Sequence, residues 1–333
     1  MALIPGSLPA ARYIRPMDAT AIAHPNIALV KYWGKRNRPL NLPAVPSVSV
    51  TLAPFETRTT VTWGSQADAF RINGETALGD AARRVGAFLD LVDPNRPPVA
   101  IESTNNFPTA AGLASSSSAF AALALAAATA AGHDRSLADL SILARQGSGS
   151  ASRSLWGGFV TWSLGQSPDG RDSHGHPIAD QTHWDLRVLV ALVSDAKKAI
   201  SSRAGMNRTQ ETSPLFDGWV QSGPSDVREA EKAILNRDLE RLGTVMEHST
   251  MKMVATMFSA QPAVMYMKPA TVAVLHAVQD LRRRGVPAWS TMDAGPNVKV
   301  LTTPDAAPAV EAALREHVST VHSLTVGGPA RVV

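Results

Sequence analysis

The sequence predicts a mixed α+β protein of two domains. Its 333 residues correspond to about two domains of ordinary size. The first half contains short Val- and Thr-rich runs bounded by Pro or Gly, which are typical of strands. In the second half, apolar residues recur at helical spacing over several long segments. Strands mixed with clustered helices in this way favour an α+β architecture.

The individual elements follow from the same patterns. Strands are expected at residues 21–33, 47–52, 57–63, 99–103, 186–194, 288–292 and 298–302, with an Asn-Gly hairpin turn inside residues 71–75. Helices are expected at residues 77–91, from about 115, and at 137–146, 225–235, 239–257 and 270–284.

These elements divide the chain into three parts. Residues 1–17 are expected to form a loose leader, because Pro and Arg punctuate them and no period is visible. An N-terminal domain is expected at residues 18–185 and a C-terminal domain at 186–333. The junction is placed in the stretch 165–182, which is polar and rich in turn-forming residues.

Composition excludes several classes of protein. Hydrophobic residues make up 44% of the chain and charged residues 18%, which excludes a disordered protein. The absence of Cys excludes disulfides, thiol catalysis and zinc-thiolate sites and is compatible with the cytoplasm, where we expect the protein. The net charge of +4 suits anionic small substrates, whereas no Lys/Arg run marks a nucleic-acid site. The longest apolar run, at residues 119–131, is too short to span a bilayer, so no membrane partner is expected.

The segment NNFPTAAGLASSSS, at residues 105–118, has the features of a phosphate-binding loop. It follows an expected strand and leads into an Ala-rich helix, whose free N–H groups and positive dipole end favour anions. The alternative is a plain helix start with Ser N-caps. The loop has neither the Walker A lysine nor the Rossmann glycine pattern. The predicted phosphate contacts are Pro108, Ala111, Gly112, Leu113, Ala114, Ser115 and Ser116, with the Ser116 hydroxyl as a candidate ligand for Mg²⁺.

The pattern P-x-x-x-G-L-x-S-S in this loop resembles the phosphate loop of the GHMP kinase superfamily. Three other segments are PNIALVKYWGK at 25–35, ARQGSGSASRSLWGGF at 144–159 and STMDAGPNVKV at 290–300. Together with the loop they resemble, in order, the signature segments of diphosphomevalonate decarboxylases, and weaker similarity extends through residues 194–216. The resemblance covers the chain from about residue 21 to its C-terminus.

This resemblance implies both a fold and a reaction. The fold would be a two-domain GHMP-kinase-like one, with the active site in the cleft between domains and commonly a homodimer. The reaction would be ATP-dependent decarboxylation of mevalonate 5-diphosphate to isopentenyl diphosphate, with Mg²⁺ accompanying ATP. Phosphorylation turns the 3-hydroxyl into a good leaving group. Phosphate then departs, and loss of carbon dioxide quenches the positive charge that develops at the tertiary carbon.

The resemblance also assigns residues to this chemistry. Asp293 would accept the proton of the hydroxyl or orient it, and Arg153 would hold the substrate carboxylate, since a planar guanidinium suits a carboxylate. Lys35 is the third residue expected in catalysis. The predicted substrate contacts are Asn26, Tyr32, Lys35, Ser148, Arg153, Ser202, Arg203 and Met206. The alternatives are a turn-forming role for Asp293, a structural salt bridge for Arg153, and a solvated face for Lys197 and Lys198.

The chain departs from the family pattern at several positions. Val45 and Pro46 stand where polar residues are usual, and Val254 replaces a frequent His. Asn37 and Arg38 stand where acidic residues are usual. These departures leave open whether the substrate carries one phosphate or two.

Three other functions are therefore considered. A decarboxylase could prefer mevalonate 5-phosphate, or a mevalonate-type kinase could phosphorylate without decarboxylating. The presence of both Asp293 and Lys35 favours decarboxylation over the kinase. A non-catalytic RNA binder is suggested only by the basic character of the chain, and salt-dependent RNA binding would test it.

Overall fold

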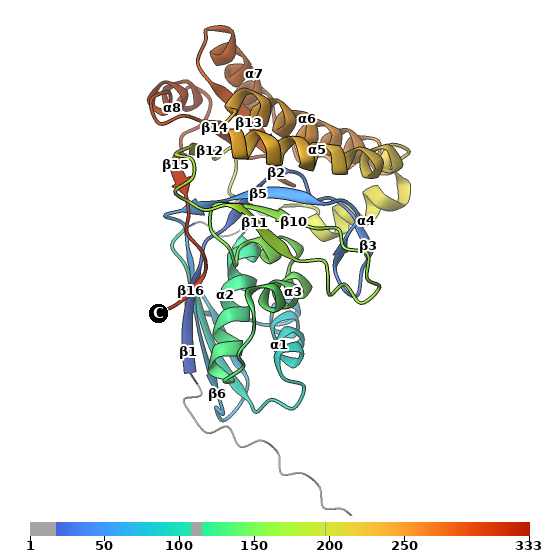
Figure 1. Ribbon diagram of the computed structural model, residues 1–333, viewed down its shortest axis with the longest axis vertical. Helices are drawn as coiled ribbons and strands as arrows, with labels where there is room; N and C mark the ends of the chain where they lie inside the picture. The colour runs from blue at the N-terminus through green and yellow to red at the C-terminus, as the bar shows by residue number, and fades with distance from the viewer. Residues whose placement is uncertain (1–17, 108–114, 197) are drawn as a thin grey trace, which may run out of the picture.

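The computed structural model describes residues 18–107, 115–196 and 198–333. The predicted leader, the loop residues 108–114 and Lys197 lie outside the described residues. Figure 1 shows α1 (Asp80–Val92), α2 (Ser115–Ala130) and α3 (Leu137–Gly147) gathered with β1 (Asp18–Ala23) and β6 (Thr57–Trp63) at one end of the molecule. The helices between residues 216 and 315, α5 to α8, lie at the other end. The mixed α+β class predicted from the sequence is confirmed.

A six-stranded sheet forms the end of the molecule near the N-terminus. Its order is β16 (Arg331–Val332), β1 (Asp18–Ala23), β6 (Thr57–Trp63), β9 (Val99–Asn105), β7 (Ala69–Ile72) and β8 (Glu75–Thr76). All neighbours are antiparallel except β7 and β9. Helix α2 (Ser115–Ala130) packs on β1 and β6. Because α2 is apolar on nearly all sides, it is buried between this sheet and α3 (Leu137–Gly147).

An eight-stranded sheet contains strands from both halves of the chain. Its order is β11 (Gly175–Ala179), β10 (Phe159–Trp162), β5 (Ser47–Ala53), β15 (Val321–Val326), β12 (Arg187–Ala191), β14 (Val298–Thr302) and β13 (Ala288–Met292), with β2 (Asn26–Val30) paired to β5. A small two-stranded sheet joins β3 (Lys35–Asn37) to β4 (Leu42–Pro43). The antiparallel contact of β5 with β15 connects the N-terminal strands to the C-terminal ones.

The remaining helices flank these sheets. They are α1 (Asp80–Val92), α4 (Ser202–Thr212), α5 (Phe216–Asn236), α6 (Leu239–Phe258), α7 (Pro269–Arg283) and α8 (Ala307–Arg315), and a 3₁₀ turn, η1, covers Gly149–Arg153. Two polar N-caps fix helix starts, because the Ser201 side chain accepts from the Ala204 N–H and Asp238 accepts from the Arg241 N–H. No helix in the described ranges combines the length and apolarity needed to cross a membrane.

Most expected elements are present, and β6, β13 and β14 have the predicted bounds. The expected helix at 225–235 begins earlier, at Phe216, and runs through Pro224. Although Pro usually ends a helix, Trp219 and Val227 on either side are buried in the core and hold α5 together. The polar stretch 165–182, in which the sequence predicts the domain junction, contains β11. The domain division after residue 185 stays a prediction.

Candidate active site

A cavity of about 730 Å³ is lined by residues from both halves of the chain. Its walls come from the segment around β2 and β3, from α1, the start of α2, the turn between α3 and η1, the region around α4, and the turn after β13. Every predicted site residue that the structure describes lines this cavity, namely Asn26, Tyr32, Lys35, Ser115, Ser116, Ser148, Arg153, Ser202, Arg203, Met206 and Asp293. Pro108, Ala111, Gly112, Leu113 and Ala114 lie outside the described residues.

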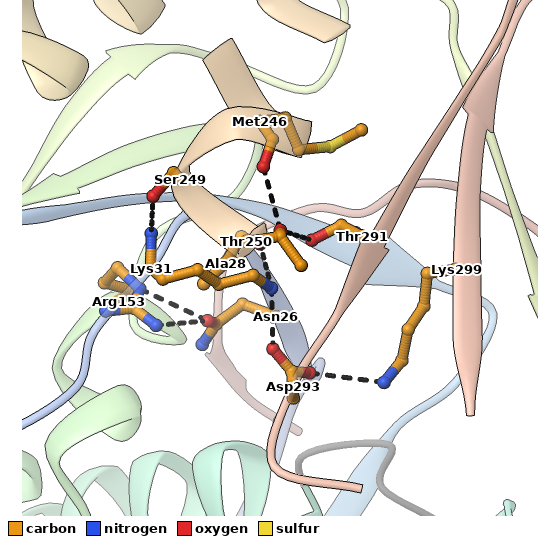
Figure 2. A network of polar contacts seen from close by, with 10 residues as sticks. All are labelled: Asn26, Ala28, Lys31, Arg153, Met246, Ser249, Thr250, Thr291, Asp293 and Lys299. Carbon is orange, nitrogen blue, oxygen red and sulfur yellow. Dashed lines mark hydrogen bonds and ion pairs between the residues drawn. The ribbon is translucent and has the colours of Figure 1, made fainter. Parts of the chain in front are cut away.

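Asp293 lies between two buried lysines (Figure 2). Its Oδ1 is 2.9 Å from the Nζ of Lys31, and its Oδ2 is 3.3 Å from the Nζ of Lys299. Both lysine side chains are 1% exposed, whereas 27% of the Asp293 side chain is exposed. Burial alone would raise the pKa of Asp293, but the two ammonium groups outweigh it and hold this pKa well below its usual range. The carboxylate is therefore ionised and reachable from the cavity.

Lys31 is fixed by two further contacts. Its Nζ donates to the Ala28 carbonyl at 2.9 Å, and its backbone N–H donates to the Ser249 hydroxyl on α6 at 3.0 Å. Burial lowers the pKa of Lys31, and the charge of Asp293 opposes that shift. The sequence prediction missed Lys31 and Lys299, although each is a lysine within an otherwise apolar strand run, a signal that could have found both.

Arg153 is buried at the end of η1, in a polar cradle. Its guanidinium donates to the Ser47 hydroxyl at 2.6 Å and to the Asn26 Oδ1 at 3.1 and 3.3 Å. The Asn26 amide is itself oriented, since it donates to the Ser150 carbonyl and the Ser154 hydroxyl. Within the described ranges no carboxylate lies at ion-pair distance from Arg153, so the alternative of a structural salt bridge is wrong there. Burial lowers the pKa of Arg153 to about 10, and Asp293 opposes the shift.

Three other cations, Lys35, Arg84 and Arg203, line the same cavity. They are called the phosphate-site cations below, after the role that is proposed for them in the next subsection. Burial, together with the charges of Arg203, Arg84 and Arg38, lowers the pKa of Lys35 to about 8. In the part of the chain that is described, none of the three has a carboxylate at ion-pair distance. This group therefore has uncompensated positive charge. Lys35 interacts electrostatically with Arg203 and Arg84, and it is not among the groups that shift the pKa of Asp293.

Arg84 on α1 was not predicted from the sequence. Its guanidinium donates to the Gly147 carbonyl at 3.2 Å and lies 5.4 Å from the centre of the Phe120 ring, which fixes the side chain at the cavity wall. Burial lowers its pKa, and so does the charge of Arg203. The sequence offers no signal that distinguishes it from its exposed neighbour Arg83.

Tyr32 directs a polar atom into this region. Its hydroxyl is buried and has no hydrogen-bond partner among the described residues. Burial raises its pKa, so the phenol stays protonated and can donate. Gly149 leaves room for the ring, because a Cβ there would lie 2.8 Å from the Tyr32 oxygen. An unpartnered buried donor beside Arg153 and Arg203 indicates a ligand with acceptor oxygens.

The start of α2 forms another wall of the cavity. Ser115 and Ser116 are its first residues, and no acidic residue lies in its first turn. The Ser116 hydroxyl is 3.1 Å from that of Ser148. These hydroxyls and a long helix N-terminus suit the phosphates of a nucleotide. The described residues contain no cluster of three His, Asp or Glu that could hold a metal ion.

The region around α4 contributes Ser202, Arg203 and Met206. Ser202 accepts from the Nζ of Lys198 at 3.3 Å, and Met206 packs at the edge of the C-terminal core. Lys198 lines the cavity, and burial lowers its pKa. The alternative that Lys198 lies on a solvated face is therefore wrong. The departures from the family pattern lie elsewhere. Val45, which packs beside Gly223 on α5, and Val254 belong to the core, and neither lines the cavity.

Comparison with known proteins agrees with this site. Residues 23–175 match the family model of the diphosphomevalonate decarboxylase-like N-terminal domain, and residues 188–326 match that of the mevalonate 5-diphosphate decarboxylase C-terminal domain. The diphosphomevalonate decarboxylase of Gibberella zeae is 40% identical over 303 residues, which cover 84% of this chain and 79% of that protein.

Solved structures agree as well. The mevalonate diphosphate decarboxylase of Staphylococcus aureus superposes with a TM-score of 0.90 at 37% identity, covering 95% of this chain and 98% of that one. A structure described as MDDEF in complex with MVAPP, AMPPCP and magnesium gives 0.89 at 40% identity, with the same coverage of 95% and 98%. The resemblance and the two-domain GHMP-type fold expected from the sequence are thus confirmed. The chain belongs to the diphosphomevalonate decarboxylase family.

Proposed function

We propose that the protein catalyses the ATP-dependent decarboxylation of mevalonate 5-diphosphate to isopentenyl diphosphate, with release of ADP, phosphate and carbon dioxide. The observation that carries this proposal is the arrangement of one cavity. An ionised carboxylate, Asp293, faces a space that also contains the buried Arg153 and the phosphate-site cations. In this cavity, the hydroxyl of the substrate would meet Asp293, its carboxylate Arg153, and its diphosphate the phosphate-site cations.

Asp293 acts on the tertiary hydroxyl. The ionised carboxylate accepts its hydrogen bond and orients the oxygen towards the terminal phosphorus of ATP. In the ligand-free protein, Lys31 and Lys299 make Asp293 a weak base because they lower its pKa. Binding of anionic substrate and ATP offsets their charge and raises the pKa of Asp293 towards its ordinary value. The proton therefore moves to Asp293 late, as the new O–P bond forms.

Arg153 orients the carboxylate that leaves as carbon dioxide. A guanidinium has five N–H groups. Three of them donate to Asn26 and Ser47, which leaves one on each terminal nitrogen for a ligand. When the phosphorylated oxygen departs with its electron pair, positive charge develops at the tertiary carbon. The bond to the carboxylate then breaks, its electron pair forms the alkene, and carbon dioxide is released.

The phosphate-site cations favour a diphosphate over a monophosphate. A phosphate monoester carries a charge of about −1.5 to −2 at neutral pH, and a second phosphate adds about one more. Lys35, Arg84 and Arg203 supply three positive charges when all are protonated, and the Tyr32 hydroxyl supplies a further donor. A diphosphate thus balances the charge of this group better than a monophosphate.

The nucleotide is placed with its phosphates at the start of α2. There Ser115 and Ser116 combine hydroxyl donors with the free N–H groups of the helix. Mg²⁺ bound to ATP neutralises charge on the phosphates, and the Ser116 hydroxyl is the proposed protein ligand. Ser116→Ala is expected to raise the KM for Mg-ATP more than the KM for the isoprenoid substrate.

One experiment tests the function directly. The pure protein is mixed with Mg-ATP and either mevalonate 5-diphosphate or mevalonate 5-phosphate, and ADP, phosphate and carbon dioxide are measured. Equal amounts of all three products with the diphosphate are expected. ADP without carbon dioxide would identify a kinase, and faster turnover of the monophosphate would reverse the substrate assignment.

Two further properties are proposed from the sequence resemblance and composition. A homodimer is expected, and light scattering coupled to size exclusion would measure its mass. A cytoplasmic location is expected too, and the absence of Cys is compatible with it. Fractionation of the source cells would test it.

A further inference from the structure

Lys299 occupies a position where an apolar residue would be expected. It lies in β14, whose residues Val298–Thr302 are all buried, and its cross-strand neighbours are Thr291 on β13 and Val190 on β12. Its side chain is 1% exposed. A buried ammonium group costs free energy unless an anion compensates it. A lysine in a fully buried strand therefore requires a partner, and the Nζ of Lys299 lies 3.3 Å from the Oδ2 of Asp293.

Lys299 and Lys31 differ in how they meet the cavity. Lys31 lines it, whereas Lys299 does not and approaches Asp293 from within the sheet (Figure 2). Each lysine holds a different carboxylate oxygen, Lys31 at Oδ1 and Lys299 at Oδ2. Two cations on two oxygens fix the plane of the carboxylate, which a single contact would leave free to rotate about the terminal bond.

We propose that Lys299 is a positioning residue that holds the carboxylate of Asp293 in the orientation in which it meets the substrate hydroxyl. Lys299 acts through Asp293 and touches no substrate, so this role depends on the proposed function of Asp293. Four charged groups bear on that carboxylate, because Arg153 and Lys198 also interact with its charge. Lys299 is the one among these four that does not line the cavity.

A double-mutant cycle tests the proposal. Lys299→Met keeps the length of the aliphatic stem and removes the charge. Lys252→Met is the matched control, because Lys252 forms a largely buried ion pair with Asp226 at 2.7 Å and neither residue lines the cavity. Turnover with mevalonate 5-diphosphate and Mg-ATP, KM, and the melting temperature are measured for both variants. Asp293→Asn and the combination Asp293→Asn with Lys299→Met complete the cycle.

The expected result is a loss of kcat in Lys299→Met of roughly threefold to a hundredfold, the usual range for coupled neighbours, with KM changed little. The acid limb of the kcat profile should move to higher pH, because removal of a cation raises the pKa of Asp293. In the Asp293→Asn background, Lys299→Met should cost almost nothing further. Lys252→Met should lower the melting temperature and leave kcat unchanged.

Three outcomes would overturn the proposal. One is full turnover in folded Lys299→Met, and another is an equal loss with and without Asp293. The third is a loss of kcat in Lys252→Met as large as that in Lys299→Met, because loss of a buried ion pair anywhere in the protein would then explain the fall in kcat. If Lys299→Met does not fold, Lys299→Gln, which keeps a hydrogen-bond donor, takes its place in the cycle. Normal turnover in Asp293→Asn would instead refute the proposed function of Asp293, which is a distinguishable result.

Discussion

Replacing Arg84 with Gln should narrow the preference of the protein for a diphosphate over a monophosphate substrate. Arg84 is one of three phosphate-site cations with no carboxylate at ion-pair distance in the described structure. A hydrogen bond to a charged group contributes about 1.5–3 kcal/mol. Its loss corresponds to a fall in kcat/KM for the diphosphate of roughly tenfold to a hundredfold. The monophosphate, which lacks the distal phosphate, should lose less than about threefold on the same scale.

Arg84 also has structural contacts, and their loss must be separated from the effect on binding. The hydrogen bond to the Gly147 carbonyl and the contact with the Phe120 ring would be lost or weakened. Together they contribute about 1–2.5 kcal/mol to stability. Gln lowers this cost because its amide can still donate. A modest fall in melting temperature is therefore expected, without unfolding of the protein at the assay temperature.

The assay compares initial rates of ADP release with both substrates at saturating Mg-ATP. Arg83→Gln is the matched control, because Arg83 is the neighbouring arginine on α1, is 78% exposed and pairs with Asp80. It should change neither the ratio of the two kcat/KM values nor the melting temperature by much. If folded Arg84→Gln kept the wild-type ratio, Arg84 would be a structural residue and the charge argument for a diphosphate would lose one of its three cations.

Other substitutions test the remaining groups. Asp293→Asn should lower turnover by about 10²–10⁴-fold with ATP binding retained, and more than about a tenth of wild-type turnover would contradict its role. Lys35→Ala and Arg203→Ala should mainly raise the KM for the diphosphate, by roughly tenfold to a hundredfold, and unchanged kinetics in both would exclude phosphate binding there. Affinity for the substrate should fall as pH rises through about 8, because Lys35 loses its proton there in the free protein. In Lys35→Arg that decline should move to higher pH, since a guanidinium stays protonated, and an unmoved decline would assign it to another group.

The sequence was informative wherever chemistry is concentrated in short segments. Asp293, Arg153 and Lys35 lie in contiguous motifs, and the resemblance of these motifs to those of one family placed them in one predicted site. The described structure brings them to one cavity, although Lys35 and Asp293 are far apart in the chain. Their catalytic and binding roles stay predictions.

The sequence was less informative where a role depends on contacts between distant segments. Arg84 and Arg83 are adjacent, and only packing against Phe120 and Gly147 directs one of them to the cavity. The strands β15 and β16 were missed because they are defined by pairing with β5 and β1 near the other end of the chain. The short helices α4 and α8 were missed as well, because a segment of so few turns shows too little apolar periodicity to be distinguished from chance spacing.

The pairing of β5 with β15 has a consequence for how the enzyme is made. Thr325 of β15 lies opposite Ala53, so the eight-stranded sheet closes only when segments from opposite ends of the chain meet. During translation, the residues of β2 and β5 are synthesised early, whereas β12, β13, β14 and β15, which complete the sheet, are synthesised later. Asp293 and Lys299 emerge in that same late stretch. A nascent chain halted before it would hold the phosphate-site cations without the carboxylate, and the growing polypeptide would carry no decarboxylase activity until its last strands were in place.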